Sequence, residues 1–281
     1  MSQKNLGIIG GGQLGSMLSQ AAKKLNIRTT IYSDDIDAPA QNFCDEFIYG
    51  EYSDKKKNLE FVGKVDVITY EFENIPYETL NEMNKLKSVL PKPSVNRLIQ
   101  HRIAEKDFIN KLNIRTTRYV SIEKKTDIET LSDFLPGILK TTTMGYDGKG
   151  QYPLKKIEDI NTLSIDFSKE YILEKLVKLK KEISVIVSRF GINNFEIYEP
   201  IENTHQDQIL KHSMMPAEIS KQIADQSKDW ATRIVEELKY IGTLCVEFFI
   251  DRNENLYVNE IAPRVHNSGH LTINAYNVSQ F

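Results

Sequence analysis

Two glutamates near the end of the 281-residue chain have the spacing of a carboxylate pair across a β-hairpin. Segments 243–250 and 256–261 alternate apolar and polar residues, as strands do, and a polar turn joins them. A four-residue turn places Glu247 opposite Glu260, whereas a shift of one residue makes Asn259 the partner of Glu247. Opposed carboxylates repel unless a cation lies between them, and Mg²⁺ takes hard oxygen ligands together with phosphate oxygens and water. The pair therefore predicts a magnesium–phosphate site, with an edge hairpin of two solvated glutamates as the alternative.

A polar loop rich in donors follows the second strand of this hairpin. Arg264, Asn267 and Ser268 offer donors suited to an anion or a sugar phosphate. His266 and His270 have an H-x3-H spacing, but no cysteine or third histidine is near them in sequence. A structural zinc site is therefore not expected, and the loop predicts an anion-binding surface.

The first of two glycine-rich loops lies near the N-terminus. Residues Gly10–Gly15 match G-x-G-x-x-G between a predicted strand and a predicted helix, where backbone N–H groups can approach a phosphate. Asp34 and Asp35 follow the next strand, about where a ribose-binding acid would lie in a dinucleotide site. This motif is compatible with a nicotinamide or flavin enzyme, with another kind of anion pocket, and with a turn that only packs strand against helix.

The second glycine-rich loop spans residues 141–150. Gly145, Gly148 and Gly150 favour a flap whose backbone amides cover phosphates. Lys140 precedes the flap on a strand and Lys149 lies within it, so that either ammonium group could meet phosphate oxygens. The alternative is a glycine-rich hairpin with solvated lysines.

The elements that position these groups follow an α/β pattern. Short apolar strands alternate with helices over the first ninety residues, which predicts a parallel sheet covered on both faces. Pro91-Lys92-Pro93 marks a domain boundary. Further along, helices are expected over 94–112, 217–240 and 271–281. His205 is compatible with a catalytic role, but a surface or capping role is the favoured interpretation.

Composition limits the partners. With 36 basic and 39 acidic side chains, the net charge of −3 provides no bulk attraction to nucleic acid or to an anionic membrane. No targeting segment is visible, because the first apolar stretch, Leu6–Ile9, stops at the glycine loop. Cys44 and Cys245 are too far apart in sequence to suggest a disulfide framework. We therefore expect a cytoplasmic protein with reduced thiols.

Taken in order, the motifs resemble those of the ATP-grasp enzymes, and among them the ligases that carboxylate aminoimidazole ribonucleotide. The resemblance covers essentially the whole chain and is most specific at its end. Its residues are Gly10–Gly15, segment 70–74 (YEFEN), Arg102, Lys106, segment 145–151 (GYDGKGQ), segment 205–210 (HQDQIL) and segment 259–270 (NEIAPRVHNSGH).

The resemblance implies an N-terminal Rossmann-like domain over 1–93 and an ATP-grasp module of two α+β subdomains over 94–178 and 179–281. Members of this family normally continue past Ser-Gln-Phe, which ends this chain, through a small β-rich segment with basic substrate contacts. We expect that segment to be missing from the module, so its contacts cannot be carried over. The resemblance further implies a homodimer.

Site residues follow from the same resemblance. The implied ATP-binding residues are Arg102, Lys140, Gly145, Gly148, Lys149, Gly150, Gln151, Glu174, Val177, Glu182, Asn259 and Glu260. Glu247 and Glu260 match the magnesium ligands, and Tyr146, Asp147, Arg264 and His266 match catalytic positions around bicarbonate. Gly12, Gln13, Leu14, Glu73, Asn267 and Ser268 match positions that bind aminoimidazole ribonucleotide.

The implied reaction is an ATP-dependent carboxylation of an amine. Bicarbonate attacks the γ-phosphoryl group to form carboxyphosphate, and the amine of aminoimidazole ribonucleotide captures its carbon directly or after release of carbon dioxide. Positioning and charge neutralisation suffice for such phosphoryl transfer, so no nucleophilic side chain is needed. Two alternatives remain, a catalytically incomplete ATP-binding fragment and a dinucleotide-dependent oxidoreductase.

Overall fold

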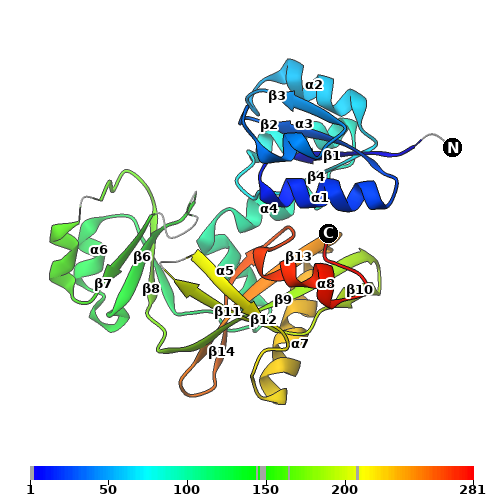
Figure 1. The fold of residues 1–281 in the computed structure, drawn as a ribbon. Coiled ribbons are helices and arrows are strands. Elements are labelled where there is room, and N and C mark those ends of the chain that lie inside the picture. Colours follow the sequence, from blue (N-terminus) through cyan, green and yellow to red (C-terminus); the bar gives the residue numbers. More distant parts are fainter. Residues whose placement is uncertain (1–2, 144, 146–149, 164, 207–208) are drawn as a thin grey trace.

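The computed structural model describes residues 3–143, 145, 150–163, 165–206 and 209–281, and its described strands form three sheets in chain order (Figure 1). Among these residues, no helix combines the length and the apolar character needed to cross a bilayer.

The N-terminal sheet is parallel, in the order β3-β2-β1-β4. Its strands are β1 (Asn5–Ile9), β2 (Arg28–Ser33), β3 (Glu46–Tyr49) and β4 (Val67–Tyr70), and the helices between and after them are α1 (Gln13–Lys24), η1 (Pro39–Asn42), α2 (Lys55–Lys64) and α3 (Tyr77–Leu86). Ile9, Tyr32 and Ile68 are fully buried on these strands. The parallel sheet expected from the alternating pattern is confirmed.

Two helices, not one, connect this sheet to the rest of the chain. The expected helix over 94–112 is wrong in one respect, because α4 (Pro93–Ile99) and α5 (Arg102–Lys111) are separated by a break. At the break, the Gln100 amide donates to the carbonyls of Glu73 and Ile75, each at 2.7 Å. The backbone is extended at His101, and Arg102 N donates to the Thr142 carbonyl at 2.9 Å instead of to a helix carbonyl, so that α5 begins anew with Arg102 as its first residue.

The middle sheet is antiparallel, in the order β5-β8-β6-β7. It contains β5 (Tyr119–Ile122), β6 (Gly137–Thr141), β7 (Gln151–Leu154) and β8 (Tyr171–Lys175), with α6 (Lys125–Glu129), η2 (Ser132–Phe134) and η3 (Ile157–Thr162) beside it. Leu139, Tyr171 and Leu173 belong to a hydrophobic core of its own.

The last sheet has the order β12-β11-β9-β13-β14, with β10 also paired to β9. Its strands are β9 (Leu179–Gly191), β10 (Asn194–Ile197), β11 (Ile201–Gln206), β12 (Ile209–Met214), β13 (Gly242–Asp251) and β14 (Leu256–Ala262). Helix α7 (Lys221–Glu237) packs Trp230 and Ile234 into the same core as Val246 and Phe248. It is shorter than the expected 217–240, because the Ser220 side chain caps it and Lys239 adopts a positive φ of 47°.

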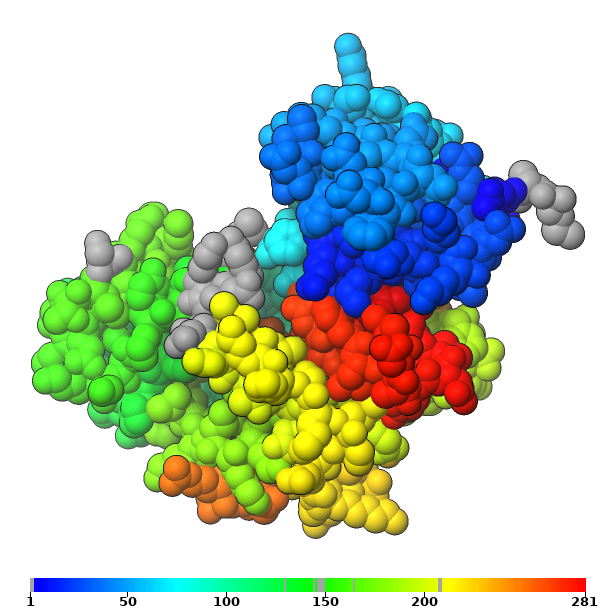
Figure 2. All heavy atoms as spheres, in the orientation of Figure 1, coloured from blue at the N-terminus to red at the C-terminus, as the bar shows by residue number. Residues whose placement is uncertain are grey.

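The C-terminal residues form η4 (Asn267–Leu271) and α8 (Thr272–Ala275), so the helix expected over 271–281 is wrong beyond Ala275. Tyr276 is extended there, and its ring packs edge-on against Tyr198 with the centroids 5.0 Å apart. The chain then runs between the N-terminal domain and the last sheet, where Figure 1 places its end. In the space-filling view, the blue N-terminal part rests on these red residues (Figure 2).

Candidate active site

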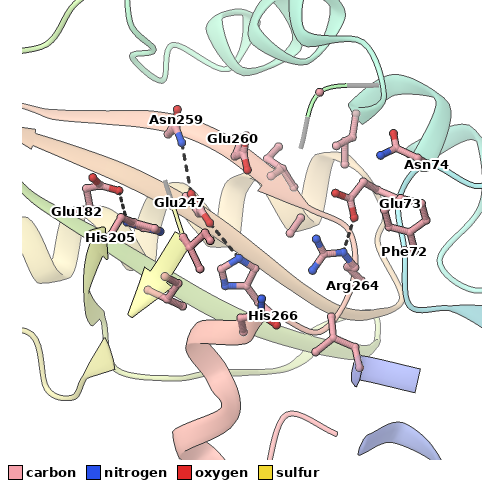
Figure 3. Close-up of a pocket in the computed structure, with 18 of the residues that line it drawn as sticks. Phe72, Glu73, Asn74, Glu182, His205, Glu247, Asn259, Glu260, Arg264 and His266 are labelled. Atoms are coloured by element: carbon pink, nitrogen blue, oxygen red, sulfur yellow. Dashed lines mark hydrogen bonds and ion pairs between the residues drawn. The ribbon is translucent and has the colours of Figure 1, made fainter. Parts of the chain in front are cut away.

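A cavity of about 1230 Å³ is lined by residues of the middle and last sheets, of α5, and of the N-terminal domain at the start of α1 and just after β4. Figure 3 shows part of its wall, with β13 and β14 opposite the segment that carries Phe72, Glu73 and Asn74. Of the predicted site residues, it gathers Gly12, Gln13, Leu14, Glu73, Arg102, Gly145, Gln151, Glu182, Glu247, Asn259, Glu260, Arg264, His266 and Asn267.

The other predicted site residues fall into two groups. Lys140, Gly150, Glu174, Val177 and Ser268 are described but do not line this cavity. Tyr146, Asp147, Gly148 and Lys149 lie outside the described residues. The flap expected over 141–150 is therefore described only in part.

The two hairpin glutamates are brought face to face by a β-bulge. Near the turn, Ile250 pairs with Leu256 and Phe248 with Val258, a register that would give Glu247 the partner Asn259. A register shift between Glu247 and Phe248 makes Glu260 the partner instead. The predicted pairing is confirmed, and the bulge, not the turn, produces it. Asn259 remains near, with its amide 3.4 Å from Glu247 Oε2 (Figure 3).

The glutamate pair is electrostatically unequal. Burial and the Glu247 charge raise the pKa of Glu260, although Arg102, with a guanidinium nitrogen 3.4 Å from Glu260 Oε2, opposes the rise. Burial would also raise the pKa of Glu247, but His266 outweighs it and lowers that pKa. Glu247 is thus paired with His266, whereas Glu260 is repelled by Glu247, and a bound cation would relieve this repulsion.

His266 is held by two side chains. Its Nε2 lies 2.9 Å from Glu247 Oε1 and its Nδ1 lies 2.8 Å from Ser268 Oγ. Burial would lower the pKa of His266, but Cys245 and Glu247 raise it to about 10. The Ser268 side chain is fully buried and its hydroxyl also contacts Ser184 Oγ at 2.8 Å, so it supports His266 from behind the cavity wall.

Three buried charges form a cluster next to the cavity. Glu174 Oε2 lies 3.2 Å from Lys140 Nζ and 3.5 Å from Lys106 Nζ. Burial would raise the pKa of Glu174, but Lys106, Lys140 and Arg102 outweigh it and lower the pKa to about 2. Burial lowers the pKa of Lys140 despite Glu174. The cluster therefore places two ammonium groups, with a single carboxylate between them, beside the Glu260–Arg102 pair.

An ion pair crosses the cavity. Arg264, after β14, donates through Nε to Glu73, which follows β4 (Figure 3). Burial would raise the pKa of Glu73, and Arg264 outweighs it. This contact links the segment after β4 to the segment after β14. Glu73 was predicted to bind aminoimidazole ribonucleotide, and Arg264 was predicted to lie near bicarbonate.

Backbone amides of the first glycine loop are hydrogen-bonded to a carboxylate group of the protein itself. Glu71, which is 8% exposed, accepts from Gly12 N at 2.9 Å and from Gly15 N at 3.2 Å. Gly10 has a φ of +100°, and a Cβ there would lie 2.6 Å from Glu71 Oε1. A carboxylate thus occupies the α1 N-terminus, the place where a dinucleotide pyrophosphate would bind. This geometry argues against the oxidoreductase alternative.

The surface or capping role favoured for His205 from the sequence is wrong. The residue is on β11 and lines the cavity, with its Nδ1 2.8 Å from Glu182 Oε2, rather than capping an element at the surface (Figure 3). The hydrogen bond to Glu182 raises the pKa of His205. Segment 201–206 (IENTHQ) has one apolar residue and no alternation, so the signal that could have placed His205 at the site is the family resemblance of segment 205–210.

Glu105 was also missed, and it holds the bulged strand in place. The residue is 3% exposed, and its Oε1 accepts from Ile261 N at 2.6 Å. The neighbouring Lys106 donates to the Asn259 carbonyl at 3.4 Å. Two consecutive α5 side chains therefore hold the backbone on either side of Glu260.

We expect Glu105→Gln to change the pH dependence of stability. Burial, followed by the Glu260 charge, raises the pKa of Glu105 from 4.5 to about 8. Because the folded-state pKa is the higher one, the wild type loses stability as pH rises from about 4.5 through about 8, and an amide has no such loss. The melting temperature of the variant relative to wild type should therefore be higher at pH 8.5 than at pH 5.5 when nucleotide and magnesium are absent. Exposed Glu237→Gln is the control, and a difference that stays constant with pH would contradict the assignment.

Comparisons with known proteins agree with this geometry. A family model of the ATP-grasp domain matches residues 107–281, and one of the ribonucleotide synthetase preATP-grasp domain matches residues 3–100. The N5-carboxyaminoimidazole ribonucleotide synthase of Staphylococcus aureus (strain COL) is 38% identical over 279 residues, which cover 98% of this chain and 74% of the relative.

Two solved structures are similar over nearly the whole chain. The S. aureus N5-carboxyaminoimidazole synthetase complexed with ADP superposes with a TM-score of 0.93 at 37% identity, covering 99% of this chain and 74% of that one. The Aspergillus clavatus synthase in complex with ADP and 5-aminoimidazole ribonucleotide gives a TM-score of 0.89 at 26% identity, covering 99% and 74%. The chain belongs to the N5-carboxyaminoimidazole ribonucleotide synthase family of ATP-grasp enzymes.

Proposed function

We propose that this protein carboxylates 5-aminoimidazole ribonucleotide to N5-carboxyaminoimidazole ribonucleotide in purine biosynthesis, with ATP and bicarbonate as cosubstrates. The observation that carries the proposal is the Glu247–Glu260 pair, which faces a cavity large enough for several ligands in a chain of this family. The ADP and aminoimidazole ribonucleotide bound to the A. clavatus relative support both substrates.

Magnesium is part of the proposal, with Glu247 and Glu260 as its side-chain ligands. No group of three or more His, Cys, Asp or Glu side chains gathers for a metal among the residues that the structure describes. Two carboxylates nevertheless fit Mg²⁺, which usually takes its remaining ligands from phosphates and water. When bound, the ion would neutralise charge on the transferring phosphoryl group.

The proposed ATP side is the region bounded by α5, the middle sheet and the hairpin. Arg102, Lys140 and the Glu174 cluster supply positive charge there, and Asn259 and Glu182 supply polar contacts. Gly145, Gly148, Lys149, Gly150, Gln151 and Val177 complete the proposed nucleotide contacts. A preorganised set of cations suits phosphoryl transfer, in which positioning and charge neutralisation do most of the work.

The carboxylation itself would take place between the hairpin and the N-terminal sheet. A bicarbonate oxygen attacks the γ-phosphorus, which forms carboxyphosphate and releases ADP. The amine then bonds to the carboxyl carbon, directly or through carbon dioxide, and phosphate leaves. Arg264 and His266 are proposed to hold the anionic intermediate, with Tyr146 and Asp147 placed around bicarbonate. Gly12, Gln13, Leu14, Glu73 and Asn267 are proposed to form the ribonucleotide side, with buried Ser268 acting through His266.

In this proposal residues 1–93, 94–178 and 179–281 act as three units around the cavity. We also propose that the protein is a homodimer in the cytoplasm, as the family resemblance implies.

An ADP-release assay tests the proposal. With Mg²⁺, ATP and bicarbonate present, addition of aminoimidazole ribonucleotide should increase ADP release, and the N5-carboxylated product should form in equal amount. Calorimetry with NADH should detect no binding, because Glu71 occupies the glycine-loop amides. Tight NADH binding, or ADP release that bicarbonate and the ribonucleotide leave unchanged, would refute the assignment.

A further inference from the structure

We propose that Gln280 is a positioning residue for the reaction, because its side-chain amide holds the backbone of His266 and so directs the imidazole at Glu247. Gln280 is 4% exposed. Its Oε1 accepts from His266 N at 2.9 Å, and its Nε2 donates to the His266 carbonyl at 2.6 Å. This inference rests on the proposed function.

The amide reaches His266 because the chain turns back after α8. The Gln280 backbone N–H donates to Thr272 Oγ1 at 3.1 Å, and its carbonyl accepts from Thr243 Oγ1 at 3.2 Å. Its side chain then packs on Gly269, where a Cβ would lie only 2.4 Å from the Gln280 amide. Ile186 Cδ1 lies equally close, so the glycine in N-S-G-H is a close-approach site for Gln280 and Ile186, which leave no room for a side chain here.

His266 needs such support because it lies between β14 and η4, outside the strand ladders. An unpaired buried N–H is costly, and Gln280 Oε1 satisfies the N–H of His266. Gln280 Nε2 shares the His266 carbonyl with Gly269 N, which donates to it at 3.0 Å. The ring is held separately, at Nδ1 by Ser268 and at Nε2 by Glu247. With the backbone and the ring both held, the imidazole has one orientation relative to the glutamate pair (Figure 3).

Gln280 does not line the cavity, so it acts through His266 and touches no substrate. Supporting residues of this kind typically change activity by about 10- to 100-fold when they are replaced. A displacement of a reacting group by about 1 Å can have a similar cost.

Gln280→Met tests the inference, because it retains side-chain length and removes both hydrogen bonds. Well below the melting temperature, we expect kcat for bicarbonate-dependent ADP release to fall by about 10- to 100-fold. The KM for ATP should change less than kcat, because the Gln280 side chain makes its hydrogen bonds to the His266 backbone and to no proposed ATP-binding residue. Asn277→Ala, which removes an exposed amide from the same segment, is the matched control and should behave as wild type. A purely stabilising role would lower the melting temperature and leave kcat unchanged, which would overturn the proposal.

A second readout does not depend on turnover. In protein labelled with ¹⁵N-histidine, the Nε2 proton of His266 should be slowly exchanging in wild type, because it is hydrogen-bonded to Glu247, and the His266→Gln spectrum assigns it. Gln280→Met, and the milder Gln280→Asn, should broaden this signal or make it exchange rapidly. A signal unchanged in both variants would overturn the inference, whereas wild-type protein that shows the signal but no carboxylation would overturn the proposed function alone.

Discussion

Glu260→Gln is expected to remove most ATP-dependent turnover and leave the fold intact. The substitution keeps the side-chain shape on β14 but removes one of the two carboxylates that face each other at the bulge. If that pair holds Mg²⁺, the loss of several kcal/mol of transition-state stabilisation lowers kcat by roughly 100- to 1000-fold. The check is ADP release at saturating ATP and magnesium.

The fold should tolerate this change because an ionised Glu260 does not stabilise the metal-free protein. The pKa of Glu260 is raised by burial and by Glu247, so the ionised carboxylate is unfavourable in the folded protein without a cation. The melting temperature of the metal-free variant should therefore equal or exceed that of wild type. Glu254→Gln, in the exposed turn of the same hairpin, is the control for a surface charge change. Turnover at the wild-type rate would exclude the metal assignment.

Glu174→Gln is expected to cause a large loss of stability. The carboxylate lies between Lys106 and Lys140, and all three side chains are less than 10% exposed. Its removal leaves two buried ammonium groups uncompensated, which costs about 3–5 kcal/mol in the free energy of unfolding. Urea denaturation at pH 7 measures the effect.

The pH dependence of this loss provides a second check. Because the folded-state pKa of Glu174 is lowered to about 2 by Lys106, Lys140 and Arg102 against the cost of burial, its contribution is present above about 4.5 and disappears as pH falls through about 2. The difference from wild type should therefore shrink in acid. Glu170→Gln, which breaks an exposed pair with His101, is the control and should cost at most about 1 kcal/mol. A comparable small cost for Glu174→Gln would show that the buried cluster is not held by this charge.

The sequence pattern predicted secondary structure correctly where the pattern lies within a single segment of the chain. The apolar strands and amphipathic helices of the first ninety residues predicted the parallel sheet, since each pattern depends on burial of one face of one element. The hairpin alternation likewise placed Glu247 and Glu260 on facing strands. Sequence also placed fourteen predicted site residues on the cavity wall, because their types and order are those of an ATP-grasp family.

Other features depended on contacts between distant segments. The helical segment 94–112 is broken at His101, where Arg102 N donates to the Thr142 carbonyl, and nothing in the helical pattern reveals that acceptor. The bulge at Glu260 lies where Glu105 and Lys106 of α5 hold the β14 backbone. Register there depends on a helix about 150 residues earlier in the chain.

The motifs of this chain were enough to name the chemistry and fourteen of the described residues that line the cavity, since side-chain type and local periodicity are properties of short segments. The roles of Glu71, Glu105, His205 and Gln280 were decided by the tertiary structure. Each acts through a hydrogen bond or ion pair with a group distant in sequence, or across a chain reversal, and the free energy of such a pair depends on burial and distance. A glycine loop that looks ready for a phosphate is thus capped by an internal carboxylate, and a residue expected in a terminal helix instead holds the histidine beside the glutamate pair.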